Sequence, residues 1–569
     1  MSDYRYPASD IQFCLEKIAQ VERLEAHFEN YTADLLEPVL SEAAKFSEQL
    51  VAPTNRLGDQ QPPKMVERCV QETPAFKDIY EALQEAGWPT LSGPEAYGGQ
   101  ALPRALEVAF NEGIQSANLS FSLCPLLTQG AIDALETHAS DALKAMFLPN
   151  MISGRWTGTM NLTEPSAGSD LAAIKTKATR EEDHYRIVGQ KIYITWGDHL
   201  MSDNIIHLVL ARLPDAPEGV KGISLFVVPK YLLDEQGEPG RRNDVFPLSL
   251  EHKLGIHGSP TCVMQFGEKE GALGYLVGEE HNGLAAMFTM MNNARQSVGL
   301  QGLAVAEAAY QKALDYAFER KQGAIKGHAD KVVIAQHADV KRMLWQMASC
   351  LAAMRALMYT ASVENDLKQV APEHAQRTEL YTPIVKGWLT ELAQEITSTA
   401  IQVHGGMGYI EETGVAQLFR DARILPIYEG TNGIQALDLV GRKLRSDKGA
   451  AMYALIEEMR TSTNDIESEV DAALLQSAIS MLEKTTQSLL EGEVPAEYVA
   501  YDYMMLSGYV LGGWQMLKGV VNGADAAWQK KARFYIRQLL PRAQMHGQAI
   551  AAYADSGMND DWDAILLQN

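Results

Sequence analysis

Residues 160–170 read MNLTEPSAGSD, and they lie where the pattern of the chain changes from helical to strand-like. Downstream of them, short segments rich in β-branched and aromatic residues are separated by Gly, Pro and Asp; these segments are 185–195, 205–212 and 222–229. Upstream, apolar residues recur at the spacing of one helix side: Leu36, Leu40, Ala43, Ala44, Phe46 and Leu50. The sequence therefore predicts a small antiparallel β domain that follows a helical domain.

Helical patterning returns at about 281 and continues almost to the end of the chain. Residues 284–320 contain no proline and are rich in Ala, Met, Leu and Gln, which favour helices. Long helices are predicted over 331–365 and over 374–404, where Gly405-Gly406 can end the second one. After about 446, further helices are predicted over 452–459, 471–490, 498–517 and 526–554.

We therefore predict a mainly α protein with a central antiparallel β domain. The expected order is an N-terminal helical extension, an N-terminal α domain, the β domain, a second α domain and an extra C-terminal helical domain. Their expected boundaries are 1–36, 37–158, 159–280, 281–445 and 446–569.

The composition of the 569-residue chain excludes several classes of function. Its formal net charge of -24 argues against a nucleic-acid partner and against a polybasic contact with anionic lipid. The five cysteines are scattered without a CxxC pair, so neither a metal site nor a disulfide framework is expected. The start of the chain has no signal-peptide pattern, and no apolar run is long enough to span a membrane. We expect a cytoplasmic protein.

Two glycine-containing strings are candidates for binding a phosphate or a flavin. In residues 160–170, backbone amides, small hydroxyls and a glycine allow close approach to a flavin edge or a pyrophosphate, although such a string alone is an ordinary polar turn. Residues 402–409 read QVHGGMGY, in which the glycines either end a helix or allow a phosphate to approach. They do not form GxGxxG after a strand, so a Rossmann site is not predicted.

The strongest candidate for a catalytic group is Glu429, in residues 419–435, FRDARILPIYEGTNGIQ. It is a single carboxylate between apolar or aromatic residues and a Gly-Thr turn. Desolvation among such neighbours would raise the pKa of the carboxyl group and make it a competent base. The ordinary alternative is a glutamate at a helix start that interacts favourably with the helix dipole.

Taken together, these strings resemble the acyl-CoA dehydrogenase family in content, order and spacing. The resemblance covers about 37–445. The motifs that carry it are Pro94–Gly99, Thr163–Asp170, Arg320 within Phe318–Lys321, Gln402–Gly406 and Tyr428–Thr431.

The resemblance implies an activity and a mechanism. Glu429 corresponds to the family's catalytic base, which takes the α proton of an acyl-CoA thioester while the β carbon passes a hydride to flavin N5. The product is a trans-2-enoyl-CoA. The charge that develops on the thioester oxygen is met by the glutamate's own backbone N–H and by a ribityl hydroxyl of FAD.

The resemblance also assigns binding residues. Those that correspond to FAD-binding positions are Met160, Leu162, Thr163, Gly168, Ser169, Tyr193, Thr195, Arg320, Gln402, Gly405, Gly406 and Thr431. Those that correspond to substrate-binding positions are Ser169, Asn292, Arg295 and Gly430. Because Arg320 and 402–406 correspond to groups that reach the FAD of a neighbouring subunit, the resemblance implies a homodimer or a tetramer. Tyr193 replaces the family's tryptophan, and Trp196 follows closely, so either aromatic ring could cover the flavin.

Other features point to the larger bacterial members of the family, which carry an extra C-terminal helical domain. The relevant strings are 194–199, 204–212 and 222–230, together with Lys321–Ala324, which departs from the common pattern. This subgroup includes 3-methylmercaptopropionyl-CoA dehydrogenases and fatty acyl-CoA dehydrogenases of β-oxidation with medium- or long-chain preference. A methylthio group and a methylene differ little in an apolar pocket, so the acyl group stays open.

The electron acceptor implied by the family is an electron-transferring flavoprotein. One alternative is an acyl-CoA oxidase, which would be reoxidised by oxygen. Others are a non-catalytic scaffold of the same fold and a flavin monooxygenase, which would not need the glutamate. The intact Glu429 in its motif argues against the scaffold.

Overall fold

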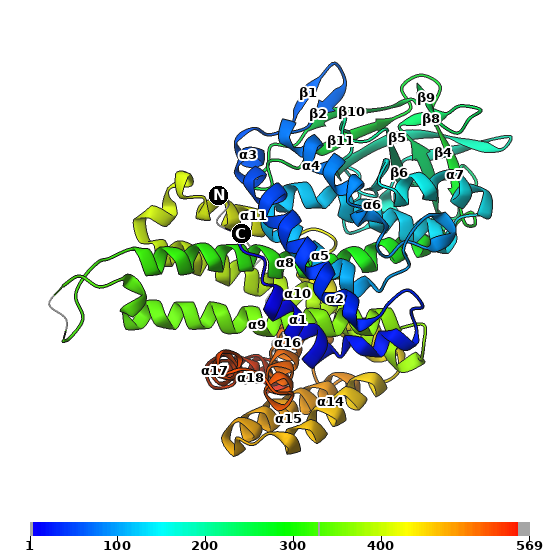
Figure 1. The fold of residues 1–569 in the computed structure, drawn as a ribbon. Coiled ribbons are helices and arrows are strands. Elements are labelled where there is room, and N and C mark those ends of the chain that lie inside the picture. Colours follow the sequence, from blue (N-terminus) through cyan, green and yellow to red (C-terminus); the bar gives the residue numbers. More distant parts are fainter. Residues whose placement is uncertain (1–3, 328–329, 556–569) are drawn as a thin grey trace, which may run out of the picture. The chain divides into compact units, whose positions relative to one another are not determined.

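The computed structural model describes residues 4–327 and 330–555, and Figure 1 shows its ribbon. The chain divides into two compact units. The first unit comprises Met1–Tyr6 and Glu42–Ser297, and the second comprises Pro7–Ser41 and Val298–Asn569. Residues 1–3 of the expected N-terminal extension and 556–569 of the expected C-terminal domain lie outside the described residues.

The first unit combines helices with a β-sheet. Two of its helices begin at side-chain caps, because Asn118 Oδ1 accepts the N–H of Phe121 and Ser140 Oγ accepts that of Leu143. The helices are α3 (Asn55–Gln60), α4 (Pro74–Glu85), α5 (Arg104–Ala117), α6 (Leu119–His138) and α7 (Asp141–Ile152). A separate two-stranded ribbon is formed by β1 (Lys64–Val66) and β2 (Cys69–Gln71).

The main sheet has eight strands, in the order β10-β11-β5-β12-β7-β6-β3, and β4 pairs with β5 and β6. The predicted strands are confirmed as β5 (His184–Thr195), β6 (Asn204–Arg212) and β7 (Ile223–Pro229). The others are β3 (Trp156–Asn161), β4 (Lys177–Glu181), β10 (Val245–Leu250), β11 (Thr261–Phe266) and β12 (Ala272–Val277). A second ribbon pairs β8 (Tyr231–Leu233) with β9 (Pro239–Arg242).

The expectation of an antiparallel β domain is wrong where β3 and β4 meet β6, and β4 makes one parallel pair there, with Lys177 opposite Arg212. β3 pairs with β6 in parallel, with Trp156 opposite Asn204 and Asn161 opposite Val209. A tight hairpin would force neighbouring strands to run in opposite directions. β4 and β5 lie between β3 and β6 in the chain, and this longer connection permits the parallel pairing.

The second unit is helical in the described residues. The long predicted helices are confirmed as α9 (Ala338–Leu367) and α10 (Pro372–His404), as is α8 (Gly283–Glu319), within which the division between the units falls. The shorter helices are α1 (Ala8–Phe13), α11 (Val415–Ala422), α12 (Asn432–Asp438) and α13 (Leu444–Ser446). α2 (Leu36–Lys45) contains a second division point, and a third lies between Tyr6 and Pro7.

The C-terminal helices of the second unit differ from prediction at one point. They are α14 (Ala450–Ser462), α15 (Glu469–Glu491), α16 (Ala496–Val521), α17 (Ala526–Phe534) and α18 (Pro541–Asp555). The single helix expected over 526–554 is interrupted by a π-helical turn at Tyr535–Leu539. Pro541 has no N–H to donate to the preceding turn, so it starts a helix rather than continuing one.

Candidate functional site

In the first unit, the predicted flavin-binding residues lie on a loop that leaves the end of β3. Glu164 and Ala167 exchange two backbone hydrogen bonds of 3.0 Å, which closes a tight turn. Gly168 and Ser169 follow it and are exposed, and a Cβ added at Gly168 would meet no atom within 4 Å. Open backbone amides beside a small hydroxyl form a donor set that suits a phosphate. Met160, Leu162 and Thr163 precede the turn.

The structure brings this loop next to the strand that carries the second set of flavin-binding candidates. The N–H of Ile192 in β5 donates to the carbonyl oxygen of Thr163 at 2.9 Å. Tyr193 follows in a β-bulge, where the register of β5 against β11 shifts, and its side chain is 61% exposed. A bulge re-aims the side chain that it carries.

The two aromatic candidates near the end of β5 have different environments. Trp196 is only 1% exposed, donates its indole N–H to the carbonyl of Ser120 at 3.1 Å and packs against Phe76. Its ring is thus committed to the interior of the first unit. Tyr193 presents its ring at the surface, whereas Thr195 is half-buried. Both Tyr193 and Trp196 have positive φ, at 60° and 51°.

The substrate-binding candidates on α8 lie one helical turn apart in the part of that helix assigned to the first unit. The guanidinium of Arg295 donates from Nη1 to Asn292 Oδ1 at 3.3 Å. Arg295 is only 5% exposed, while Asn292 is half-buried. Asn292 is therefore the more accessible of the two within this unit.

In the second unit, Glu429 lies in the connection between α11 and α12. α12 begins at Asn432, and its N-cap is Thr431, whose hydroxyl accepts the N–H of Ile434 at 3.2 Å. Glu429 stands two residues before this cap and is half-buried, so the capping role belongs to Thr431. Glu429 has φ 54° and Gly430 has φ 84°, a sharp turn that is strained at the glutamate.

Two glutamines that motif reasoning did not assign support this connection. The side-chain amide of Gln435 donates to the Glu429 carbonyl at 3.3 Å, and the hydroxyl of Tyr428 donates to Gln301 Oε1. Burial, reinforced by the negative charge of Glu429, raises the pKa of Tyr428, so its hydroxyl remains a proton donor. Gln435 lies within residues 419–435, which contain Glu429, whereas no sequence pattern around Gln301 indicates its hydrogen bond with Tyr428.

The remaining candidates lie at the ends of α8 and α10. His404 stacks on Tyr316 with ring centroids 4.4 Å apart, and its Nδ1 donates to the Ala400 carbonyl at 2.8 Å. The histidine is therefore a packing residue, and its stacking brings the two helix ends together. Gly405 has φ 61° and ψ -141°, a conformation open to glycine. Four candidates here are exposed: Arg320, Gln402, Gly405 and Gly406.

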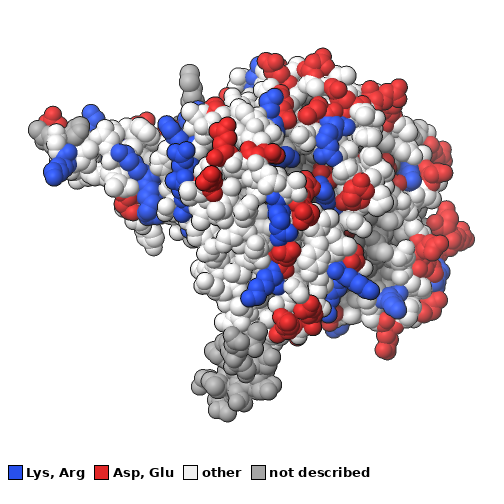
Figure 2. Space-filling model, turned by 90° about the horizontal axis from the view of Figure 1, so that it is seen from below, with Lys and Arg blue, Asp and Glu red and all other residues white. Residues whose placement is uncertain are grey.

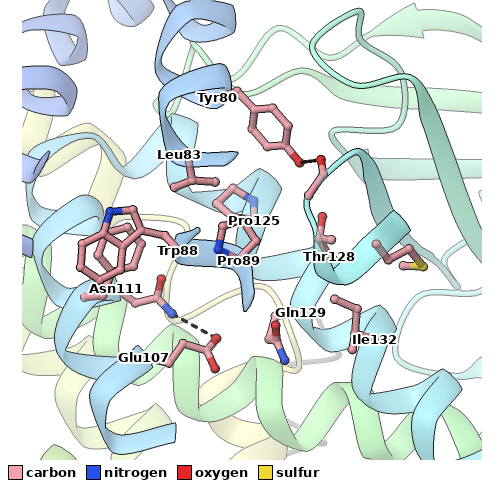
Figure 3. A pocket seen from close by; sticks show the side chains of 13 residues that line it. Tyr80, Leu83, Trp88, Pro89, Glu107, Asn111, Pro125, Thr128, Gln129 and Ile132 are labelled. Atoms are coloured by element: carbon pink, nitrogen blue, oxygen red, sulfur yellow. Dashed lines mark hydrogen bonds between the residues drawn. The ribbon is translucent and has the colours of Figure 1, made fainter. Parts of the chain in front are cut away.

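A pocket elsewhere in the first unit contains none of the predicted site residues. It encloses about 490 Å³, part of it open solvent, and is lined by residues that include Tyr80, Trp88, Glu107 and Gln129 (Figure 3). Burial raises the pKa of Glu107, whose carboxyl accepts a hydrogen bond from the Ser92 hydroxyl.

Several classes of site are missing from the part of the chain that the structure describes. No group of His, Cys, Asp and Glu side chains there could hold a metal ion, and all five cysteines are free thiols. None of the helices within 4–327 and 330–555 is long and apolar enough to cross a membrane. Acidic and basic side chains are interspersed over most of the face shown in Figure 2.

Four family profiles match the chain in succession. They are the acyl-CoA dehydrogenase N-terminal domain over 42–155, the middle domain over 159–268, the C-terminal domain over 281–444 and an acetyl-CoA dehydrogenase C-terminal-like domain over 455–560.

Individual relatives agree with these profiles. The chain is 42% identical to 3-methylmercaptopropionyl-CoA dehydrogenase of Ruegeria pomeroyi, and the alignment covers 99% of each chain. The fold is similar to that of ACDH-11 of Caenorhabditis elegans in complex with C11-CoA, with a TM-score of 0.79, 20% identity and coverage of 98% and 96%. It is also similar to an acyl-CoA dehydrogenase of Bacillus anthracis complexed with FAD, with a TM-score of 0.72, 19% identity and coverage of 95% and 91%.

Proposed function

The chain belongs to the acyl-CoA dehydrogenase family, and on that basis we propose the residues, the cofactor and the acyl group that its reaction uses. As a member it is a flavin-dependent oxidoreductase of acyl-CoA thioesters. The observation that supports the assignment of residues is the environment of Glu429. Its half-buried carboxylate lies on a strained turn, and Thr431 rather than Glu429 caps helix α12.

Glu429 is the catalytic base. Its carboxylate removes the proton from the carbon α to the thioester carbonyl as a hydride leaves the β carbon, which gives a trans-2-enoyl-CoA. Bound FAD supplies the hydride acceptor. The backbone N–H of Glu429 donates to the thioester oxygen, where negative charge develops. The left-handed backbone at Glu429, followed by Gly430, supports a role in which one residue offers both its carboxylate and its N–H to the substrate.

FAD is held by the residues that match the family's FAD-binding positions. Gly168 and Ser169 supply amide and hydroxyl donors to its phosphates, and the exposed ring of Tyr193 covers the flavin, with Thr195 beside it. Met160, Leu162, Thr163 and Thr431 complete the FAD contacts. The exposed Arg320, Gln402, Gly405 and Gly406 reach the FAD of a second subunit, which makes the protein a homodimer or a tetramer. Ser169, Asn292, Arg295 and Gly430 contact the acyl-CoA.

The acyl group is 3-methylmercaptopropionyl, and the relative from Ruegeria pomeroyi supports this choice by its identity over nearly the whole chain. A medium- or long-chain fatty acyl group is the alternative. The electrons pass to an electron-transferring flavoprotein. An acyl-CoA oxidase would instead release hydrogen peroxide under air, so peroxide measured during turnover distinguishes the two.

The test is anaerobic bleaching of the flavin absorbance by a panel of acyl-CoAs, from short to long straight chains and with 3-methylmercaptopropionyl-CoA included. We expect Glu429→Gln to retain FAD and to slow bleaching by about 100-fold or more, since general bases contribute roughly 10²–10⁴-fold. Glu497→Gln, at an exposed glutamate in the first turn of α16, is the matched control. Bleaching of Glu429→Gln at the wild-type rate would show that another group is the base.

A further inference from the structure

We propose that Glu164 and Lys191 are positioning residues that hold the FAD-binding loop at 164–176 closed at its base and fixed to strand β5. The inference rests on the proposed function, because it takes Gly168, Ser169 and Tyr193 as FAD contacts. It adds two residues that touch neither the cofactor nor the substrate and act through those that do.

The side chain of Glu164 closes the base of this loop. Its Oε2 accepts the N–H of Lys175 at 2.6 Å. Its Oε1 accepts the N–H of Thr176 at 3.1 Å and the hydroxyl of Thr176 at 2.6 Å. One carboxylate therefore joins the first residue of the loop to its last two, and between them Gly168 and Ser169 lie exposed.

Lys191 fastens this base to the neighbouring strand. Its ammonium group donates to Glu164 Oε1 at 2.8 Å and to the Leu162 carbonyl at 3.0 Å. The side chains of Lys191 and Glu164 are 0% and 4% exposed. Tyr193 follows Lys191 by two residues in β5, so the ion pair fixes the spacing between the loop and the aromatic ring that we assign to the flavin.

The far half of the loop has a separate support. Arg212 at the end of β6 donates from Nη2 to the Ala172 carbonyl at 2.7 Å and from Nε to the Ile174 carbonyl at 3.2 Å. Residues 165–171 lie between these two supports and include both proposed phosphate contacts; within them, Asp170 Oδ1 accepts the N–H of Ala172 at 3.0 Å.

The chemistry of the pair favours a geometric role over a purely stabilising one. Burial lowers the pKa of Lys191 to about 8, although Glu164 opposes that shift. Burial alone would raise the pKa of Glu164, but Lys191 and the hydrogen bonds of Thr176 and Lys175 hold it below its ordinary value. An apolar pair of similar volume often stabilises a core as well as an ion pair does. The directional bonds to the loop and to Leu162 are what such an apolar pair would lack.

The experiment compares Lys191→Met, Glu164→Gln and the double variant with wild type. Apoprotein is titrated with FAD, and the dissociation constant is read from flavin fluorescence. We expect each single variant to bind FAD at least tenfold more weakly. The double variant should be no weaker than the weaker single variant, because both act through one ion pair. At saturating FAD, the KM for acyl-CoA should rise more than kcat falls, because the loop moves while Glu429 does not.

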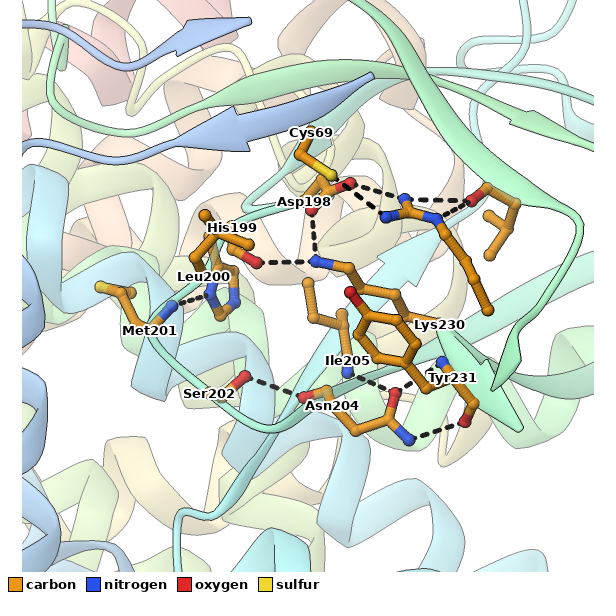
Figure 4. Close-up of polar contacts among 12 residues, drawn as sticks. Cys69, Asp198, His199, Leu200, Met201, Ser202, Asn204, Ile205, Lys230 and Tyr231 are labelled. Carbon is orange, nitrogen blue, oxygen red and sulfur yellow. Dashed lines mark hydrogen bonds and ion pairs between the residues drawn. The ribbon is translucent and has the colours of Figure 1, made fainter. Parts of the chain in front are cut away.

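Lys230→Met is the matched control (Figure 4). Lys230 is a lysine of the same β domain with a 3% exposed side chain, and it donates to Asp198 Oδ1 at 2.6 Å and to the His199 carbonyl at 2.7 Å. Its removal also breaks a buried ion pair, but one without a contact to 164–176. We expect Lys230→Met to have a lower unfolding temperature but an FAD affinity within about twofold of wild type. A twofold change in affinity is far smaller than the loss of a charged hydrogen bond would cause.

Three outcomes would overturn the inference. The first is wild-type FAD affinity in both single variants, and the second is an equal loss of affinity in Lys230→Met, which would show a general effect of the domain. If Lys191→Met and Glu164→Gln do not fold, the variant Glu164→Asp replaces them, because it keeps the negative charge but shortens the reach to Thr176. The third outcome that would overturn the inference is wild-type FAD affinity in Glu164→Asp. A wild-type protein that binds no FAD contradicts the proposed function as well, whereas equal binding by wild type and variants contradicts this inference alone.

Discussion

At the scale of single residues, some of the unusual backbone conformations lie at candidate functional positions, although others lie elsewhere in the chain. Tyr193, Trp196 and Glu429 all have φ between 51° and 60°, a region that bulky side chains rarely adopt. Such strain costs about 1–3 kcal/mol per residue, so the surrounding contacts must hold it in place. For Trp196 the contacts are the Ser120 carbonyl and Phe76, and for Glu429 they include the Gln435 amide.

The two aromatic residues at the end of β5 should respond oppositely to substitution. Trp196→Phe loses the bond to Ser120 and should lower the free energy of unfolding by about 1 kcal/mol while the flavin spectrum of the folded protein is unchanged. Tyr193→Ala removes an exposed ring and should change stability by less than about 0.5 kcal/mol, but it should shift the flavin absorbance and weaken FAD binding. Chemical denaturation and flavin spectra measure both. A spectral change in Trp196→Phe alone would reverse the assignment.

Gln435 is predicted to act on catalysis through Glu429. Gln435→Leu removes the donor to the Glu429 carbonyl, so the strained turn should relax and the carboxylate should lose its position. Small displacements of a reacting group cost up to about 100-fold in rate, and we expect kcat to fall by roughly tenfold or more with FAD still bound. Stopped-flow reduction of the flavin measures this. An unchanged kcat would mean that the turn is held by its other contacts.

At the scale of elements, Asp244 organises the turn that precedes β12. One carboxylate oxygen, Oδ2, accepts the backbone N–H groups of residues 268–271 at 2.8–3.1 Å. Burial alone would raise the pKa of Asp244, but these N–H groups hold it below the ordinary value of 3.8. A single charged side chain thus accepts hydrogen bonds from four backbone N–H groups that have no partner strand in this turn.

Asp244 therefore makes the sheet sensitive to acid. Because its pKa is lowered in the folded state, its contribution is present above pH 3.8 and is lost as the pH falls through the lower folded value. Asp244→Asn should reduce the free energy of unfolding by about 2 kcal/mol at neutral pH and should flatten the loss of stability below pH 4. Urea unfolding at several pH values tests this. A variant with the same acid slope as wild type would assign the slope to other carboxyl groups.

At the scale of the whole molecule, the C-terminal helices share a core with α10 inside the second unit. A Cβ on Gly508 of α16 would lie 2.2 Å from Cγ of Trp388, so the absence of a side chain is what permits this contact. Trp388 is fully buried and also packs edge-on against Tyr509. Arg542 of α18 donates to Glu395 of α10 at 2.6 Å. Residues after 446 thus complete the packing of helices that precede them.

This shared core should make the C-terminal region indispensable for stability. Deletion of 446–569 would expose Trp388 and its apolar neighbours, and burying one such side chain is worth about 1.5–3 kcal/mol. We expect the truncated protein to unfold at a lower temperature or to aggregate. Gly508→Ala is the milder version, and overpacking should cost it roughly 1–3 kcal/mol. A truncated protein with the size, stability and kinetics of wild type would contradict this view.

Sequence reasoning predicted the regular elements well and the supporting contacts poorly. The strands β5, β6 and β7 and the long helices α8, α9 and α10 are confirmed, because strand and helix spacing of apolar residues is a local property. The parallel pairing of β3 with β6 was missed, because it joins segments about 50 residues apart through an unpredictable crossover. The break before Pro541 was missed as well, although the proline itself was a visible signal.

By itself the sequence determined the family, the helix–sheet–helix order and Glu429 as the proposed base, because motifs and their order along the chain can be recognised without a three-dimensional structure. Only the tertiary structure distinguished the environments of Tyr193 and Trp196, because the burial of Trp196 depends on Phe76 and Ser120, which are remote in the chain. Only the structure joined Gln301 to Tyr428 and Lys191 to Glu164. Hydrogen bonds between distant segments leave no periodic pattern in a sequence, so their partners become known when the chain is folded.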